Sequence, residues 1–215
     1  MKKIIFLLSI LTLLTTANAH ITNYNPGLYL GGQVGWGRIN EGDGYKQYVE
    51  SQPINTVERG TFTGWRAYGG YSFVPFFSIE GGYTYYPDNT YTTTANTINI
   101  KSYTIDLVAR ITLPLAVLNT NTWLSHFSIY GKGGGAYINT KIDTINGIKK
   151  SSDIIHPTFG AGLVFNFTDN IALDASWTSV LGKNRISLNQ VATENPTPHC
   201  NLFTLGLSYK ITGIF

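Results

Sequence analysis

Seven charged residues occupy alternate positions within segments that have the character of β-strands. They are Arg66, Glu80, Asp106, Arg110, Lys132, Asp174 and Lys210, four positive and three negative. Successive side chains of a strand point to opposite faces, so each of these charges lies on the face that also carries the small and polar residues. A charge taken out of water costs several kcal/mol unless it is paired. The pattern therefore predicts ion pairs enclosed by the strands rather than a catalytic centre.

The other chemically capable residues are sparse. His199 and Cys200 are adjacent and are expected to lie in a loop, but no third ligand follows at a spacing that suits a metal. Glu41, Asp43 and Glu50 are too far apart for a calcium loop. No glycine-rich loop with a phosphate-binding lysine is present. The sequence predicts no metal and no cofactor.

The strands that hold the charges share a second feature, which is a row of apolar and aromatic residues on the opposite face. In the segment from 61 to 73, Trp65, Tyr71 and Phe73 alternate with Arg66 and Tyr68. Eight segments alternate in this way: 27–37, 61–73, 77–86, 102–113, 127–138, 155–167, 171–181 and 202–211. Apolar side chains toward lipid and polar ones toward a lumen, in strands of about 10 residues, are typical of a membrane barrel. We therefore predict an all-β fold, an eight-stranded antiparallel transmembrane up-and-down β-barrel.

The connections between these strands alternate in length. Tight turns are predicted at 74–76 and 168–170, and the longer segment 114–126 falls on the same side. The stretches on the other side are rich in Asn, Thr, Gly, Asp and Lys and are expected to be surface loops: 38–60, 87–101, 139–154 and 182–201. Short turns in the periplasm and long loops outside are the pattern of outer-membrane barrels, and an even strand number places both ends of the barrel on the turn side.

The first residues have the features of an export signal. Two lysines precede an apolar run from Ile4 to Leu14, and a small-residue cleavage site follows at 17–19. We expect residues 1–19 to be removed and residues 20–215 to form one barrel domain.

The formal net charge of +3 includes Lys2 and Lys3, so it gives little reason to expect a nucleic-acid partner. The single cysteine, Cys200, excludes an internal disulfide. It is expected to be a free thiol just before the last strand, rather than half of an intermolecular bridge.

The stretch from Gly64 to Tyr91, GWRAYGGYSFVPFFSIEGGYTYYPDNTY, resembles two strands of the outer membrane protein A family. The similarity lies in Gly-Gly-Tyr, a tight turn with proline, an aromatic residue, an inward glutamate and Gly-Tyr. It continues in FGAGLVFNFTDNIALDASWTSVLG (159–182) and LFTLGLSYKI (202–211), so it covers essentially the whole mature chain. Opacity-type and attachment-type surface barrels share this fold and stay open as alternatives.

The resemblance implies that the interior holds paired charges rather than an open channel. Glu80 falls on the family's interior glutamate and Arg110 on an interior lysine. Two positions depart from the family, since Asp174 stands in place of an arginine and Val164 in place of a glutamate. The pairing must then be rearranged. We expect Glu80 to pair with Arg110 or Lys132, and Asp174 with Arg66.

The resemblance also implies an assembly signal in the last strand, which the outer-membrane assembly machinery reads. The residues that fit it are Gly206, Tyr209, Ile211 and Phe215. Four residues, 212–215, follow the family's usual end, so the stretch that is read stays open. The remaining partners implied are outer-membrane lipids and lipopolysaccharide, with the barrel as a monomer.

Three roles remain for such a chain in the outer membrane. The first is a structural, surface-exposed barrel. The second is an adhesin or host-contact protein acting through the loops, and the third is a narrow pore of low conductance gated by the lumen salt bridges. No enzymatic activity is expected from the candidate catalytic residues.

His126 and Ser128 are faintly similar to the His-x-Ser pair of lipid A deacylase barrels, but both have inward parity and no partnering acid is near. His156 alone is expected to be a hydrogen-bonded lumen residue.

Overall fold

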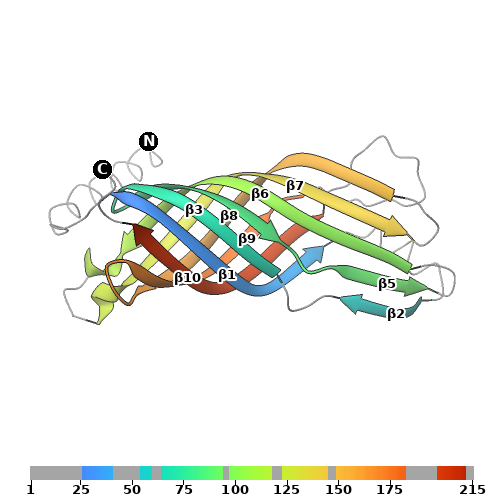
Figure 1. Cartoon of the computed structure of the whole chain (residues 1–215), viewed down its shortest axis with the longest axis horizontal. Helices are drawn as coiled ribbons and strands as arrows, with labels where there is room; N and C mark the ends of the chain where they lie inside the picture. The colour runs from blue at the N-terminus through green and yellow to red at the C-terminus, as the bar shows by residue number, and fades with distance from the viewer. Residues whose placement is uncertain are drawn as a thin grey trace, which may run out of the picture.

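A computed structural model describes residues 26–40, 54–59, 64–93, 97–117, 123–144, 149–182 and 198–211. Most of this chain is β-strand, wound into a closed barrel whose long axis is horizontal in Figure 1. The predicted export signal at 1–19, Phe215, residues 61–63 and most of the segments 38–60 and 182–201 lie outside the described residues. No helix in the described ranges is long and apolar enough to cross a membrane.

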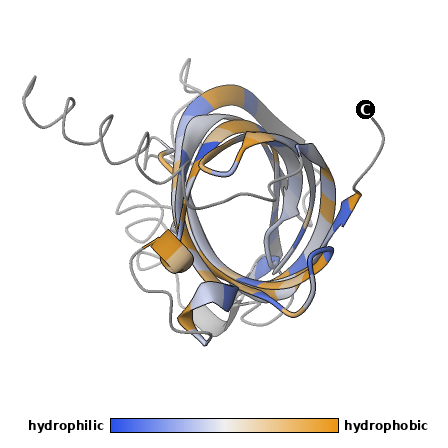
Figure 2. Ribbon diagram, turned by 90° about the vertical axis from the view of Figure 1, so that its left-hand side faces the viewer, coloured by the Kyte–Doolittle hydropathy of each residue, from blue (hydrophilic) through white to orange (hydrophobic). Residues whose placement is uncertain are grey.

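The sheet is entirely antiparallel and closes on itself. The strand order is β2-β5-β6-β4-β3-β1-β10-β9-β8-β7, and a further pairing of β6 with β7 completes the ring of eight that is seen end-on in Figure 2. The strands of the ring are β1 (Gly27–Asn40), β3 (Gly64–Val74), β4 (Phe77–Tyr85), β6 (Thr97–Pro114), β7 (Phe127–Thr144), β8 (Lys149–Asn166), β9 (Ile171–Val180) and β10 (His199–Ile211). The predicted eight-stranded up-and-down barrel is confirmed.

One end of the barrel carries the short connections. Pro75 and Phe76 join β3 to β4, and residues 167–170 join β8 to β9. The longer connection between β6 and β7 includes two short 3-10 helices, η1 (Leu115–Val117) and η2 (Leu124–His126). β1 begins and β10 ends at this same end, where Leu28 pairs with Ile211. We call it the turn end, and the predicted tight turns are confirmed.

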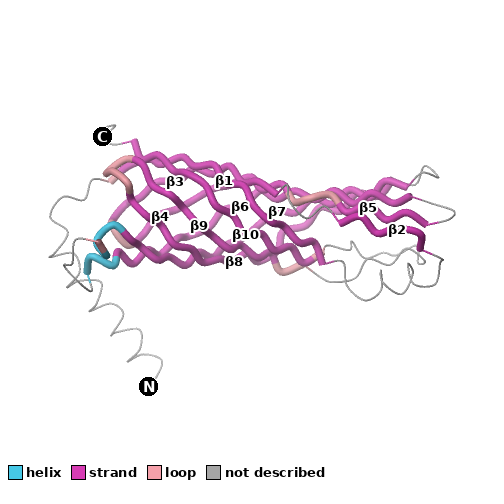
Figure 3. The backbone as a smooth tube through the Cα atoms, turned by 90° about the horizontal axis from the view of Figure 1, so that it is seen from below, coloured by secondary structure: helices cyan, strands magenta, loops and turns pink. Residues whose placement is uncertain are grey.

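The opposite end differs from the prediction of long loops. β2 (Ile54–Arg59) and β5 (Asn89–Thr93) pair with each other, and β5 also pairs with the start of β6, from Thr97 to Ile100. β7 and β8 also remain paired far past the point where β9 ends. Figures 1 and 3 show this part of the sheet projecting from one side of the barrel, and we call it the extension: β2, β5, 97–101, 139–144 and 149–154.

The extension therefore corrects the loop assignments of 87–101 and 139–154, and of 54–59 within 38–60. These stretches are rich in Thr, Asn and Lys, which suit loops and solvent-exposed strands alike. Pairing with a neighbouring strand decides between the two, and the sequence does not show pairing. β10 likewise begins at His199, so His199 and Cys200 lie in a strand and not in a loop.

The two faces of the barrel wall have the predicted character. Large apolar side chains lie exposed on the outside, where Val34 is 69% and Leu107 is 64% exposed. Arg66, Glu80 and Asp174 point inward and are each 1% exposed. Leaving so many apolar side chains in water would cost much free energy, so this outer surface suits lipid. The outside is thus the membrane-facing surface and the core of the molecule is the lumen.

Two bands of aromatic residues lie on the outer surface. Toward the extension, Trp65 stacks with Tyr85, and Tyr83 stacks with Tyr103. At the turn end, aromatic rings also meet, both within one strand segment and between neighbouring strands: Tyr71–Phe73, Phe73–Phe77, Phe127–Phe165 and Phe165–Phe167. Aromatic side chains favour the interface between hydrocarbon and water, so the two bands mark the limits of the membrane-spanning zone.

Candidate functional site: the filled lumen

Six of the seven predicted charges meet in one group in the middle of the lumen. We call it the ionic layer; its members are Arg66, Glu80, Asp106, Arg110, Lys132 and Asp174, three positive and three negative. They project from β3, β4, β6, β7 and β9. The sequence places each of them on the inner face, and closing the barrel brings them within contact distance.

Glu80 is the shared anion of this layer. Its carboxylate lies 3.0 Å from Arg66, 3.3 Å from Arg110 and 3.5 Å from Lys132. The hydroxyl of Tyr29 also donates to it at 3.3 Å. The predicted pairing of Glu80 with Arg110 or Lys132 is confirmed, and both cations contact it.

The predicted pairing of Asp174 with Arg66 is wrong. Arg66 binds Asp106 through the two terminal nitrogens of its guanidinium, with Nη2 donating to Oδ1 at 2.8 Å. Asp174 instead lies 3.6 Å from Arg110 and accepts hydrogen bonds from Tyr68 at 3.0 Å and Tyr130 at 2.8 Å. Neither acid lies on a strand that pairs with β3, but β6, which carries Asp106, is two strands away from β3, whereas β9, which carries Asp174, is three strands away.

Three inward tyrosines complete the layer, and they are not among the site residues predicted from the sequence. Tyr29, Tyr68 and Tyr130 each donate a hydrogen bond to a carboxylate of the layer. Arg110 also lies over the ring of Tyr130, 3.6 Å from its centre, a favourable cation–π arrangement. Their inward parity within polar rows was the available sequence signal.

Glycines on facing strands make room for these large side chains. A β-carbon on Gly82 would collide with the guanidinium of Arg66, and one on Gly162 would collide with the ring of Tyr130. At these two positions the missing side chain leaves the space that the lumen side chain occupies. At Gly160 and Gly206 a β-carbon would instead collide with the backbone of a neighbouring strand, so those glycines permit close approach of strands.

Lys210, the seventh predicted charge, does not join the ionic layer. It lines a cavity of about 150 Å³ at the turn end, together with Arg110, Ser128 and Ser208. Within the ionic layer the side chain of Arg110 is the most exposed, at 10%, against 1–3% for those of Arg66, Glu80, Asp106, Lys132 and Asp174. The layer is thus reached from the turn end past Arg110. We call this space the turn-end cavity.

On the other side of the ionic layer the lumen becomes apolar. Beyond a cluster in which Ser176 and Thr204 donate to the amide oxygen of Gln33, a group of fully buried side chains fills the barrel. We call this group the apolar plug; its members are Ile39, Tyr86, Ala136, Ile138, Val180, Cys200 and Leu202, each at most 7% exposed. The plug is not predicted from the sequence, because the inward rows are expected to be polar along their whole length.

The remaining candidates take ordinary structural places. Cys200 is a free thiol, as expected, but it is buried in the plug within β10. His126 does not face inward: it is exposed in η2, with Nδ1 3.1 Å from the carbonyl oxygen of Asn166, while Ser128 is buried on the inner face. His156 faces the lumen as expected. His199 lies 3.2 Å from the hydroxyl of Ser179.

No site for chemistry emerges from these placements. Among the described residues, no three His, Cys, Asp or Glu side chains gather so as to hold a metal ion. The carboxylates of the ionic layer are held by cations and tyrosine hydroxyls rather than aimed at an open pocket. What this geometry does is fill and brace the lumen.

Comparison with known proteins agrees with this architecture. Residues 6–210 match the family model described as outer membrane protein beta-barrel domain. A protein of Coxiella burnetii described only as uncharacterized is 28% identical, over 86% of this chain and 85% of its own length. Outer membrane protein A of Klebsiella pneumoniae is 24% identical over 85% of this chain, which spans 50% of that relative.

Among solved structures, the chain is similar to Neisserial surface protein A, with a TM-score of 0.52 and 15% sequence identity. The similarity covers 87% of this chain and 100% of that chain. At this level of identity the likeness concerns the fold alone.

Proposed function

Since the chain belongs to the outer membrane protein beta-barrel family, we propose that it is a structural barrel of that membrane with a sealed lumen. The observation that carries this proposal is the filling of the lumen by the ionic layer and the apolar plug. Eight-stranded barrels are narrow enough for side chains to fill them. The barrel then serves by its presence in the membrane and by the surface it displays.

The proposal includes an orientation. The turn end faces the periplasm and the extension faces the outside, because short turns inside and long excursions outside are the usual arrangement of this architecture. Outer-membrane lipids and lipopolysaccharide surround the wall, and the assembly machinery reads the last strand, which carries Gly206, Tyr209 and Ile211.

Heat-modifiable gel mobility tests whether the chain is a membrane barrel. Protein refolded in detergent is run with and without boiling. A faster unboiled band is expected, because a closed barrel resists unfolding by detergent. A water-soluble protein with no difference in mobility would contradict the membrane assignment.

Conductance in planar bilayers separates the sealed barrel from the narrow gated pore. A sealed barrel gives no steps of current, either in the native protein or after Glu80→Ala, because the apolar plug still closes the lumen. A pore gated by lumen salt bridges gives larger single-channel currents when Glu80 no longer holds Arg66, Arg110 and Lys132. Current that rises in Glu80→Ala would overturn the sealed lumen.

Contact with other cells or molecules is a second candidate, and the extension favours it. The paired strands of the extension hold this part of the chain clear of the barrel rim, whereas isolated loops would need to be ordered on binding. Its exposed surface carries Lys101, Lys141 and Asp153. Shortening the β7–β8 hairpin by removing 141–150 should leave the heat-modifiable band intact and abolish attachment to cells or surface polymers. Unchanged attachment would count against this role.

A further inference from the structure

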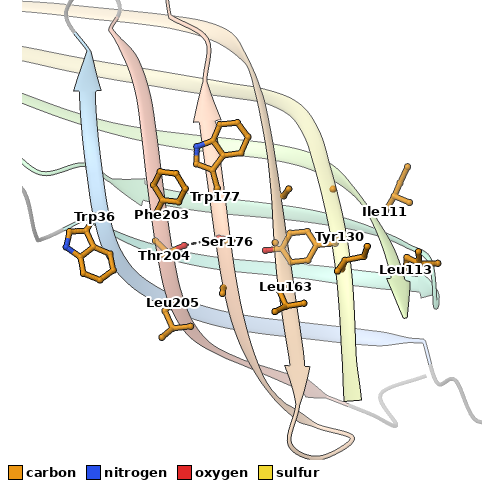
Figure 4. Close-up of a pocket in the computed structure, with 15 residues that line it drawn as sticks. Trp36, Ile111, Leu113, Tyr130, Leu163, Ser176, Trp177, Phe203, Thr204 and Leu205 are labelled. Atoms are coloured by element: carbon orange, nitrogen blue, oxygen red, sulfur yellow. Dashed lines mark hydrogen bonds between the residues drawn. The ribbon is translucent and has the colours of Figure 1, made fainter. Parts of the chain in front are cut away.

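The outer wall has a hollow that the sealed-barrel function does not use. It is a groove of about 840 Å³ over strands β6 to β10 and the adjoining end of β1 (Figure 4). Its size falls in the range of about 300–1,000 Å³ that is usual for ligand pockets. The side chains that border it are almost all apolar. We call it the wall groove.

Small residues form the floor of the wall groove. Ala175 on β9, Ala161 on β8 and Gly131 on β7 lie on three successive strands and point outward, with the backbone of Gly162 between them. A β-carbon on Gly131 would approach nothing closer than the carbonyl oxygen of Gly160, at 4.0 Å. Packing of the barrel therefore does not demand glycine here, and the hollow exists because the side chain is missing.

Large side chains form two walls around this floor. Trp177 and Phe203 stand side by side on β9 and β10, with ring centres 6.3 Å apart, and Figure 4 shows Trp36 next to them on β1. The other wall is aliphatic, with Leu163 on β8 and Ile129 on β7 41% and 44% exposed. The aromatic wall and the aliphatic wall therefore border an apolar hollow that is open to the outside.

We propose that the wall groove holds one acyl chain of a membrane lipid more firmly than the rest of the wall does. The groove is continuous with the lipid-facing surface, so hydrocarbon is the material available to fill it. Within a membrane no hydrophobic force drives association, and packing contacts decide which groups stay together; small residues allow the closest approach. An unfilled hollow would forfeit dispersion contacts along its whole lining.

The proposal rests on the membrane location proposed above and adds a place and a partner to it. The lipid is recognised by its hydrocarbon chain, since the wall groove offers no charged side chain to a headgroup. The competing occupant is a second copy of this chain, whose own apolar wall could fill the groove and make a dimer.

Native mass spectrometry of the full chain tests the proposal. The protein is refolded in vesicles of dimyristoyl phosphatidylcholine, extracted into mild detergent and stripped stepwise by collisional activation. One phosphatidylcholine adduct should outlast the others on the native barrel. In Gly131→Leu, whose new side chain occupies the floor, the lipid-bound fraction should fall at least threefold at the same activation.

Gly32→Leu is the matched control. Gly32 also faces outward, on β1, and a β-carbon there meets nothing within 4 Å, but it does not line the wall groove. Both variants should keep the heat-modifiable band, and Gly32→Leu should keep the adduct. Equal retention in the native protein and Gly131→Leu, or no adduct on the native barrel, would overturn the proposal. So would a dimer that Gly131→Leu alone dissociates.

Failure of the wall-groove proposal can be told apart from failure of the membrane location. A folded barrel without a retained lipid removes only the wall groove as a site. A chain that does not enter vesicles at all removes the membrane location, and with it both proposals.

Discussion

The lumen is packed in opposite ways at its two levels, although β1, β7 and β9 contribute side chains to both. The ionic layer is built from charges and tyrosine hydroxyls, whereas the apolar plug is built from aliphatic side chains, a tyrosine and a thiol. The polarity of the outer surface also differs between the two levels, in the opposite sense. Beside the ionic layer it is apolar, and near the extension Arg38, Lys101 and Lys141 point outward and are exposed.

The difference follows from what surrounds each level. Within the membrane the outside must be apolar, so polar and charged residues are left for the lumen, where they must pair. Beyond the aromatic band the surroundings are water, and the usual preference for an apolar interior returns. The barrel therefore has an apolar outside and a polar interior within the membrane, which we call the inside-out arrangement. Beyond the membrane it has the polar outside and apolar interior of a water-soluble β-protein.

The largest expected effect comes from removing the shared anion of the ionic layer. Glu80→Ala leaves Arg66, Arg110 and Lys132 without their common partner, and breaking a buried charge pair typically costs about 3–5 kcal/mol. The free energy of unfolding, measured by urea titration in lipid vesicles, should fall by that order. Asp169→Ala, which removes an exposed acid in a turn, should change it little. A small loss in Glu80→Ala would show that the charges do not brace the barrel.

The apolar plug should respond to loss of volume rather than of charge. Leu202 is 1% exposed, and Leu202→Ala should lower the free energy of unfolding by about 2–5 kcal/mol, the usual cost of a buried leucine-to-alanine change. Leu205, on the same strand but facing lipid and 49% exposed, provides the control. Lipid can fill the space left by Leu205→Ala, so its loss should be clearly smaller. Equal losses would contradict a packed plug.

The turn-end cavity and the apolar plug should also differ in how readily water reaches them. Ser128 lines the turn-end cavity, whereas Cys200 is buried in the plug. In a Cys200→Ser background, Ser128→Cys should react with a small water-soluble thiol reagent at least tenfold faster than the native Cys200 does. The check is the rate of mixed-disulfide formation in folded protein. Fast reaction of Cys200 would mean that water passes the plug.

The smallest effect is expected on the outer surface near the extension. Lys101 and Asp88 form an ion pair at 3.6 Å, with side chains 53% and 34% exposed. Solvent weakens such pairs, which typically contribute about 0–1 kcal/mol. Lys101→Ala should shift the urea midpoint little, and high salt should remove any shift. A loss of stability as large as that of Glu80→Ala would contradict the assignment of this part of the outer surface to water.

The strands themselves could be found without the structure, but their full length could not. Each of the eight segments coincides with all or part of one barrel strand, since alternation between lipid and lumen is a local property. The extension was missed because water lies on its outer side, which removes the contrast that marked the strands. Residues 97–101 and 139–144 show this: their polar outward positions resemble a loop, yet they pair along their length.

By itself the sequence determined which face of each strand meets lipid, and therefore which charges enter the lumen. The tertiary structure alone decided how those charges pair. Arg66 binds Asp106 rather than Asp174, because strand order and register set which inward residues share a level. It also decided that Ile39, Ile138 and Leu202, distant in the chain, meet as one plug. Parity along a strand is fixed locally, whereas contact across a lumen exists only once the barrel closes.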